Sequence, residues 1–302
     1  MERSPVSRRR ALAGMAVALG GAGYVGASGV SGGSETVSML AAGSLNNALE
    51  NGLRPSVDAR LEVEAHGSAQ VARLVAEGAK TPDIVSLADV ALFDAWVKPA
   101  WYAEFATNAV VVAYNPETEG GRRLSAVGAD EWYRPLLDGS VALGRTDPDL
   151  DPLGYRTLFM LELATAYYDL DVDLRETIPR REQVYPETQL ISGFETGAID
   201  AAVAYRNMAV ERGYDYVELP AEIDQSDPRL ADHYSRARYE LPDGTVVTGR
   251  PISYGSTMLR ESPVVRDVFE AHVSGPYLES FGFGVPADYP RYTPHAPDTL
   301  AN

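Results

Sequence analysis

Short apolar runs, several of them rich in β-branched residues, recur along the chain between polar turns that contain Gly, Pro, Asp or Asn. Such runs are typical of buried β-strands. The pattern predicts strands at residues 36–42, 60–65, 83–87, 109–114, 140–144, 201–205, 216–219 and 252–258.

Amphipathic segments lie between several of these strands. Apolar residues recur at helical spacing in residues 69–77, 154–168 and 188–196. Gly78 and Gly197 follow two of the segments, as glycines often do at helix C-termini. Alternating strands and helices predict an α/β protein whose parallel sheets are covered by helices on both faces. Residues 220–248 are polar and rich in Asp and Pro, and we interpret them as an insertion or long loop.

The N-terminus has the pattern of an export signal. Residues 7–12 read SRRRAL, and residues 11–30 follow as a stretch of small and apolar residues without a charge. Val25-Gly26-Ala27 is a plausible cleavage site with small residues. We predict that residues 1–30 are a twin-arginine-like export signal. An uncleaved membrane anchor stays open as the alternative, because about 20 apolar residues can just span a bilayer.

Composition excludes several classes of protein. The formal net charge of −17 argues against a nucleic-acid partner, which requires a basic surface. Lys80 and Lys98 are the only lysines, so Arg supplies almost all positive charge, and we interpret this acidic surface as halophilic adaptation. With no cysteine, the chain has neither disulfides nor a lipid-anchor cysteine. Its four histidines do not show zinc-enzyme spacing.

Two predicted strands end in a small residue and a hydroxyl directly before a helix. Gly43-Ser44 follows the strand at residues 36–42, and Gly67-Ser68 follows the strand at 60–65. Free backbone N–H groups at helix N-termini bind anions, and ligands of α/β sheets bind beyond the carboxyl ends of strands. A single pair of this kind is more simply explained as a plain N-cap, but two in succession favour an anion site.

Longer motifs carry a resemblance to a known family. AAGSL at residues 41–45, GS at 67–68, PDIVS at 82–86 and FATN at 105–108 resemble a molybdate-binding protein of an ABC importer. DLDPLGYR at residues 149–156, PET at 186–188, GAID at 197–200 and YR at 205–206 are similar to its archaeal molybdate/tungstate-binding branch. LPAEI at 219–223 and PISYG at 251–255 belong to the same pattern, which covers residues 36–285.

The resemblance implies a two-lobed type II periplasmic-binding-protein fold with one oxyanion in the cleft between the lobes. Lobe I would comprise residues 36–106 plus 261–302 and lobe II residues 107–260, with crossings at residues 107–109 and 259–261. The implied ligand-binding residues are Gly43, Ser44, Ser68, Asp151, Pro152, Leu153, Glu187 and Tyr205. Asp151 and Glu187 would coordinate the molybdenum or tungsten of the bound oxyanion. The implied protein is a monomer at the extracellular face of the membrane that meets a permease and has no cofactor of its own.

The acidic residues also have a simpler interpretation. Asp151 precedes Pro152 at a predicted helix start, and Glu187 begins another helix, where acids commonly stabilise the N-terminus. A carboxylate beside a dianion is repelled, unless the central atom accepts carboxylate oxygen as a ligand. Molybdenum and tungsten do so, whereas sulfur and phosphorus do not. Tyr205 ends a strand, so its phenol could donate to the anion or pack in the core.

Other functions stay open. Asp151 and Glu187 could bind a metal cation directly, or the same fold could bind sulfate or phosphate. An enzyme is disfavoured because the sequence lacks GxSxG and a recognisable triad. We therefore predict an extracytoplasmic solute-binding protein that captures tungstate or molybdate, and no enzyme.

Overall fold

The computed structural model describes residues 35–242, 244, 246–297 and 299–300, except the side chains of Glu187 and Thr188. The predicted export signal at residues 1–30 therefore lies outside the described residues. Among the helices that are described, none combines the length and apolar character needed to cross a membrane.

The strands form two sheets and one separate hairpin. The first sheet has the order β12 (Arg291–Tyr292), β4 (Ala103–Asn108), β11 (Ile252–Met258), β3 (Ile84–Leu87), β1 (Thr36–Ala42) and β2 (Arg60–His66). The second has the order β6 (Leu143–Gly144), β7 (Ala201–Tyr205), β5 (Val110–Tyr114) and β8 (Asp215–Val217). The hairpin pairs β9 (Arg238–Glu240) with β10 (Val246–Thr248).

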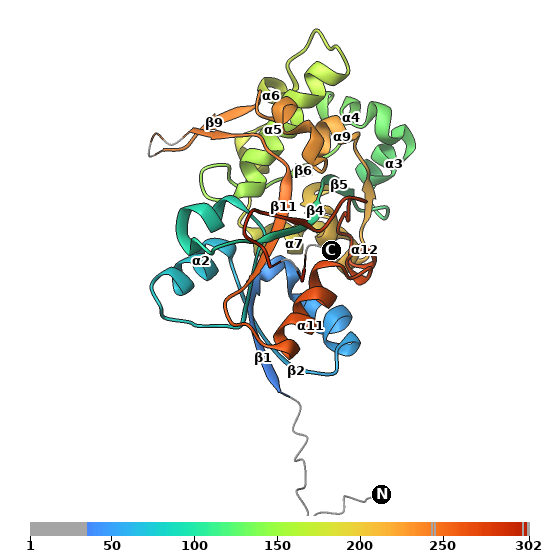
Figure 1. Cartoon of the computed structure of the whole chain (residues 1–302). Coiled ribbons are helices and arrows are strands. Elements are labelled where there is room, and N and C mark those ends of the chain that lie inside the picture. The colour runs from blue at the N-terminus through green and yellow to red at the C-terminus, as the bar shows by residue number, and fades with distance from the viewer. Residues whose placement is uncertain (1–34, 243, 245, 298, 301–302) are drawn as a thin grey trace, which may run out of the picture. The chain divides into compact units, whose positions relative to one another are not determined.

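The helices differ widely in length. The longer ones are α2 (Ser68–Ala76), α3 (Glu119–Glu131), α5 (Pro152–Tyr167), α7 (Glu187–Glu195), α8 (Arg206–Arg212) and α11 (Pro263–Val273). The short ones are α1 (Asn46–Ala48), α4 (Arg134–Leu137), α6 (Leu174–Thr177), α9 (Ala221–Asp224), α10 (Ala231–Tyr234) and α12 (Tyr277–Ser280). Figure 1 shows β11 and β4 near the middle, with α2, β1 and α11 below them and α5, α4 and α3 above.

Alternating side chains give the first sheet two buried faces. Met39 of β1 packs in the cluster that contains Phe269 of α11, whereas its neighbour Leu40 packs with Val71 of α2. This alternation follows from the two-residue period of a strand. Because both faces of the sheet are covered, the sequence of β1 is a nearly continuous apolar run. This run is why the sequence predicted the strand.

The second sheet is covered in the same way. Val112 of β5 belongs to the cluster with Leu161 of α5, and Val111 packs with Phe194 of α7. Gly144 of β6 lies so close to Leu190 of α7 that an added Cβ would be 2.4 Å from Leu190 Cδ1. Glycine at this position therefore allows α7 to approach the sheet.

The structure differs from the sequence analysis in four respects. Strand β4 was not predicted, and the sheets are mixed rather than parallel, because β11 runs antiparallel to β3 and β4 and β5 runs antiparallel to β7 and β8. Since β11 pairs within the first sheet, the second passage between sheets lies before Ile252 and not at residues 259–261. Residues 220–248 are no plain loop: they contain α9, α10 and the β9–β10 hairpin.

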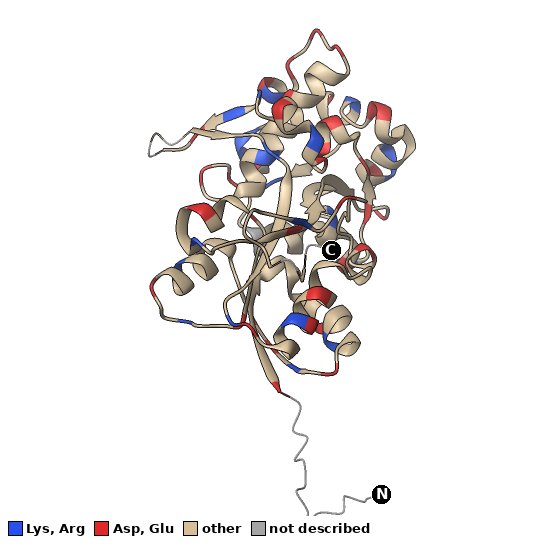
Figure 2. Ribbon diagram, viewed as in Figure 1, with Lys and Arg blue, Asp and Glu red and all other residues tan. Residues whose placement is uncertain are grey.

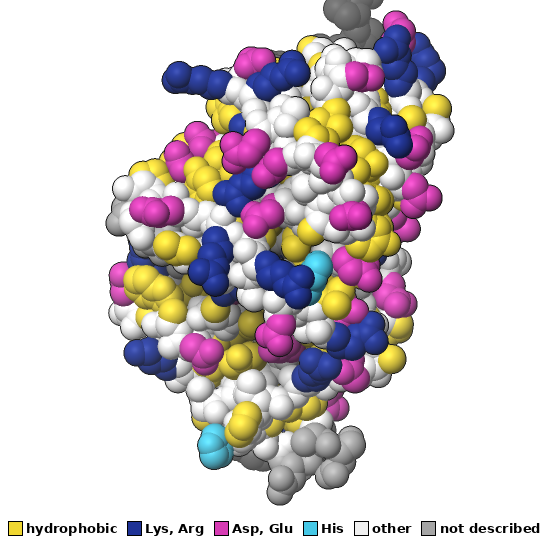
Figure 3. Space-filling model, turned by 90° about the horizontal axis from the view of Figure 1, so that it is seen from above, with side chains coloured by type: hydrophobic (Ala, Val, Ile, Leu, Met, Phe, Trp, Pro, Cys, Tyr) yellow, Lys and Arg dark blue, Asp and Glu magenta, His cyan; other side chains and the backbone are white. Residues whose placement is uncertain are grey.

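Charged residues lie mainly on helices and turns, while the strands carry few of them (Figure 2). Over the face seen from above, basic and acidic side chains alternate among small apolar areas (Figure 3). Alternating charges of this kind keep a surface hydrated without creating one large field.

A chain of buried hydrogen bonds connects the first sheet to α11 and α12. Ser86 Oγ lies 2.7 Å from Ser256 Oγ and 2.9 Å from Nε2 of His272. The other ring nitrogen, Nδ1, lies 2.8 Å from the hydroxyl of Tyr277. Burial lowers the pKa of His272 to about 3, so the imidazole is neutral in the folded protein.

We predict that acid destabilises the fold through His272. Below pH 6.5 the unfolded chain protonates this histidine and the folded chain does not, until the pH falls to about 3. The free energy of unfolding should therefore fall by about 1.4 kcal/mol per pH unit across this window from His272 alone. Denaturant unfolding at several pH values should show a shallower slope for His272→Gln than for the unmodified protein. His66→Gln, at a partly exposed position, is the control; equal slopes in all three proteins would contradict the prediction.

Candidate functional site

A cavity of about 410 Å³ lies where β1 and β7 end. Its walls come from the turn after β1, the loop before α5, the helix α7 and the passage from β7 into α8. The lining residues include Gly43, Ser44, Thr146, Asp151, Leu153, Leu190, Ile191, Tyr205, Asn207, Met208, Glu211 and Arg212. Five of the eight residues that the sequence singled out, Gly43, Ser44, Asp151, Leu153 and Tyr205, thus lie around one cavity.

Asp151 both caps a helix and lines this cavity. It is the N-cap of α5, and its Oδ1 accepts a hydrogen bond from Leu153 N at 2.7 Å. Pro152 occupies the first helical position, where its missing N–H costs nothing. Burial raises the pKa of Asp151, while the bond from Leu153 opposes that rise. The second oxygen of Asp151, Oδ2, takes no part in the hydrogen bond with Leu153.

Ser44 is held by a buried polar network. Its Oγ lies 3.0 Å from the hydroxyl of Tyr254, and its carbonyl accepts from Asn207 Nδ2 at 3.0 Å. Asn108 Nδ2 donates to Asn207 Oδ1 at 2.7 Å and to the Tyr254 hydroxyl at 3.2 Å. Because an amide nitrogen can only donate, the Tyr254 oxygen accepts from Asn108 and its proton can go to Ser44 Oγ. This arrangement leaves the proton of Ser44 available to a ligand.

Tyr205 lies at the end of β7 and is the N-cap residue of α8. Burial raises the pKa of its phenol, although the positive charge of Arg156 opposes this. The phenol is therefore protonated at neutral pH and can donate a hydrogen bond into the cavity. The position of Tyr205 is compatible with a donor role toward the ligand, and that role stays a prediction.

The structure does not place Ser68 in the lining of this cavity. Ser68 is the first residue of α2, and its Oγ accepts from Ala88 N at 3.0 Å. Glu187 begins α7, whose residues Leu190 and Ile191 line the cavity, but the Glu187 side chain lies outside the described part. Its ligand role stays a prediction.

Four polar lining residues, Thr146, Asn207, Glu211 and Arg212, were missed by the sequence analysis. Thr146 and Asn207 are buried, and Arg212 is held by Glu195, whose Oε1 lies 3.2 Å from Nη1. A single polar residue after a strand or inside a helix has no sequence pattern that predicts where it points. In the part of the chain that is described, His, Asp and Glu do not gather in threes or more as a metal centre would require.

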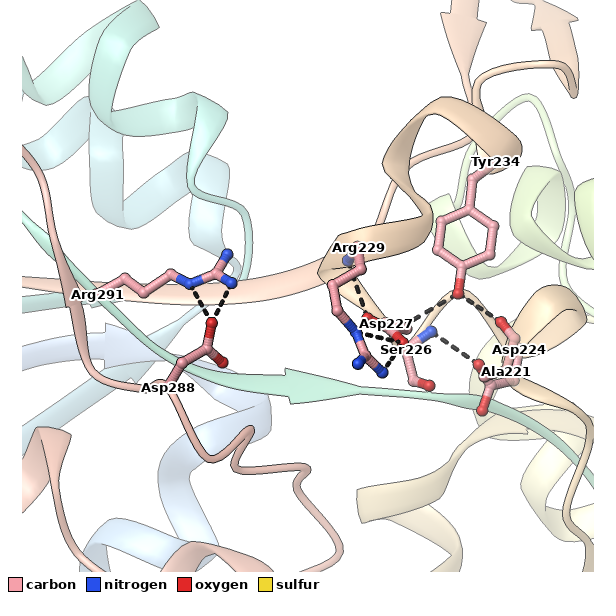
Figure 4. Close-up of polar contacts among 8 residues, drawn as sticks. All are labelled: Ala221, Asp224, Ser226, Asp227, Arg229, Tyr234, Asp288 and Arg291. Carbon is pink, nitrogen blue, oxygen red and sulfur yellow. Dashed lines mark hydrogen bonds and ion pairs between the residues drawn. The ribbon is translucent and has the colours of Figure 1, made fainter.

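A second cavity, of about 600 Å³, includes Thr107 and Arg206 in its lining. Figure 4 shows Asp227 with Arg229 on one side and Asp288 with Arg291 on the other. Arg229 Nε lies 3.0 Å from Asp227 Oδ1, and Arg291 Nε lies 2.8 Å from Asp288 Oδ2. Since these charges pair with each other, the first cavity is the better candidate site.

Residues 41–267 match the family described as bacterial extracellular solute-binding protein. A putative ABC transporter molybdenum-binding protein of Haloferax volcanii is 53% identical over 266 residues, which cover 87% of this chain and 86% of the relative. The chain belongs to the extracellular solute-binding protein family. A molybdate/tungstate-binding protein of Thermococcus kodakarensis is 28% identical to this solute-binding protein over 231 residues, 68% of this chain and 65% of the relative.

Solved structures agree on the fold. The substrate-binding domain of a putative molybdenum ABC transporter from Clostridium difficile superposes with a TM-score of 0.57 at 15% identity. The match covers 83% of this solute-binding protein and 99% of the other chain. The predicted type II periplasmic-binding-protein fold is therefore confirmed.

We predict that Asn108→Ala destabilises the protein by about 3 kcal/mol. The change removes the amide that donates to Asn207 and Tyr254 and also accepts from Ala109 N, and buried groups left unpaired cost about 1–3 kcal/mol each. Denaturant unfolding measures the change. Asn51→Ala, which removes an exposed side-chain bond to Asn47, is the control and should cost less than about 0.5 kcal/mol. Similar losses in both variants would contradict the role of the network.

Proposed function

We propose that this solute-binding protein captures molybdate or tungstate outside the cytoplasm and delivers it to the permease of an ABC importer. Its relatives from Haloferax volcanii and Thermococcus kodakarensis carry names for binding molybdenum and molybdate/tungstate. The described cavity supports this proposal, because its lining combines hydroxyl groups with a carboxylate.

One observation carries the proposal: a partly buried carboxylate, Asp151, shares a cavity with the hydroxyl donors Ser44 and Tyr205. The hydroxyls can donate to oxo groups. Asp151 would repel a sulfate or phosphate dianion, but it can bind a metal centre that expands its coordination. The site therefore discriminates by coordination as well as by hydrogen bonding.

Closure would complete the site. Glu187 would add a second carboxylate from α7, and Pro152 and Leu153 would contribute the start of α5. Ser68 would join only when the two sheets move closer. We infer two lobes, each built around one sheet, which close on the ligand because it contacts both.

We further propose that residues 1–30 direct export through a twin-arginine route and that the protein acts as a monomer at the extracellular face. It carries no resident cofactor, performs no catalysis, and uses its acidic surface to stay soluble at high salt. Replacing Arg8 and Arg9 by Lys should retain the protein inside the cell. Unchanged secretion of that variant would point to another route.

Calorimetric titration of the purified protein with tungstate, molybdate and sulfate tests the function. The proposal expects tight one-to-one binding of tungstate and molybdate, and no binding of sulfate. Binding of sulfate with equal affinity would not affect the assignment of the fold. It would show that the two carboxylates only cap helices and do not coordinate a metal centre. Binding of a divalent cation that a chelator reverses, without any oxyanion binding, would favour a cation-binding protein.

We predict that Asp151→Asn lowers tungstate affinity roughly tenfold or more, equivalent to about 1.4 kcal/mol. Asparagine caps helices as well as aspartate does, so the helix start is kept while the metal loses an anionic ligand. The matched control is Asp173→Asn, which changes the N-cap of α6, where Asp173 accepts from Arg175 N and Glu176 N. Calorimetry should show normal affinity for this control. Equal affinity of both variants for tungstate would mean that Asp151 only caps helix α5.

A further inference from the structure

A third cavity, of about 160 Å³, lies between α5, α9 and the segment that leads from β10 into β11. The lining includes Tyr155, Arg156, Phe159, Gln225, Thr248 and Arg250. It shares no lining residue with the candidate oxyanion site. Two arginines, Arg156 and Arg250, thus line one small volume.

Arg156 is buried without a negative partner among the described residues. Its side chain is 6% exposed, and Nη1 donates only to Gln225 Oε1 and to the carbonyl of Arg250, both at 3.4 Å. Its Nε has no hydrogen-bond partner in the described structure. A buried cation with only long bonds to neutral acceptors is costly, and an anion in the adjoining cavity would offset that cost.

The charges around the cavity specify the kind of anion. Arg250 forms an ion pair with Asp89, so these two side chains together contribute no net charge. Among the residues that line the cavity, the positive charge left over is that of Arg156. A single excess positive charge matches a monovalent anion better than a dianion. Tyr155 adds a hydroxyl, which burial keeps protonated by raising its pKa.

We propose that this cavity binds one chloride ion between the guanidinium groups of Arg156 and Arg250, with the Tyr155 hydroxyl as a neutral donor. The ion would tie α5 to the segment before β11. Since Asp151 caps the same helix, chloride would stabilise the element that lines the oxyanion site. The proposal does not depend on which oxyanion that site binds.

Thermal unfolding tests the proposal in solution. Sodium chloride replaces sodium gluconate at constant total sodium, so that ionic strength stays fixed. The unmodified protein should show a saturable rise in Tm with chloride. Arg156→Gln should lose this rise, and Tyr155→Phe should raise the half-saturating concentration about threefold to tenfold. The control Arg145→Gln removes an equally buried arginine outside the cavity, and should keep the rise.

Bromide provides a direct readout that needs no variant. Crystals of the unmodified protein soaked in sodium bromide should show an anomalous peak between Arg156 and Arg250. Absence of a peak would mean that water alone fills the cavity and would overturn the proposal. A peak without a saturable effect on Tm would show an adventitious ion only. If Arg156→Gln keeps the rise in Tm with chloride, the proposed chloride site is also wrong.

Discussion

The hydrogen bonds of one buried side-chain amide, that of Asn108, fix the position of the first sheet relative to the second. Asn108 ends β4, directly before the chain enters the second sheet, and it is fully buried. Both sides of its amide are used, toward Tyr254 in β11, Asn207 in α8 and the backbone of Ala109. Because a buried amide must be fully paired, few relative arrangements of these elements are permitted. The position of Ser44, which bonds to both Tyr254 and Asn207, follows from that constraint.

The sequence predicted those elements whose buried side chains recur at regular spacing within the element itself. Strand β1 and helix α2 bury side chains at regular spacing, so period alone identifies them. Which sheet a strand joins depends on distant partners, and for this reason the sequence did not place β11 beside β3 and β4. Strand β4 was missed because Glu104 and Asn108 interrupt its apolar pattern.

In the candidate site, too, local sequence patterns were predictive and contacts between distant residues were not. Ser44 and Ser68 have the same local signal, a hydroxyl after a strand and glycine, yet the described structure places only Ser44 in the cavity lining. For Asp151, the two interpretations that the sequence left open are compatible, since one residue caps α5 and lines the cavity. Asn207 gave no signal, because its importance comes from contacts with Ser44 and Asn108 that are distant in the chain.

Three consecutive residues at the start of α8 face two different cavities. Tyr205 and Asn207 line the candidate oxyanion site, whereas Arg206 lines the second cavity. The Nε of Arg206 donates to the carbonyl of Gly282 at 2.9 Å. Tyr205 and Arg206 therefore connect the two cavities through adjacent backbone positions, and a displacement of the start of α8 would change the lining of both at once.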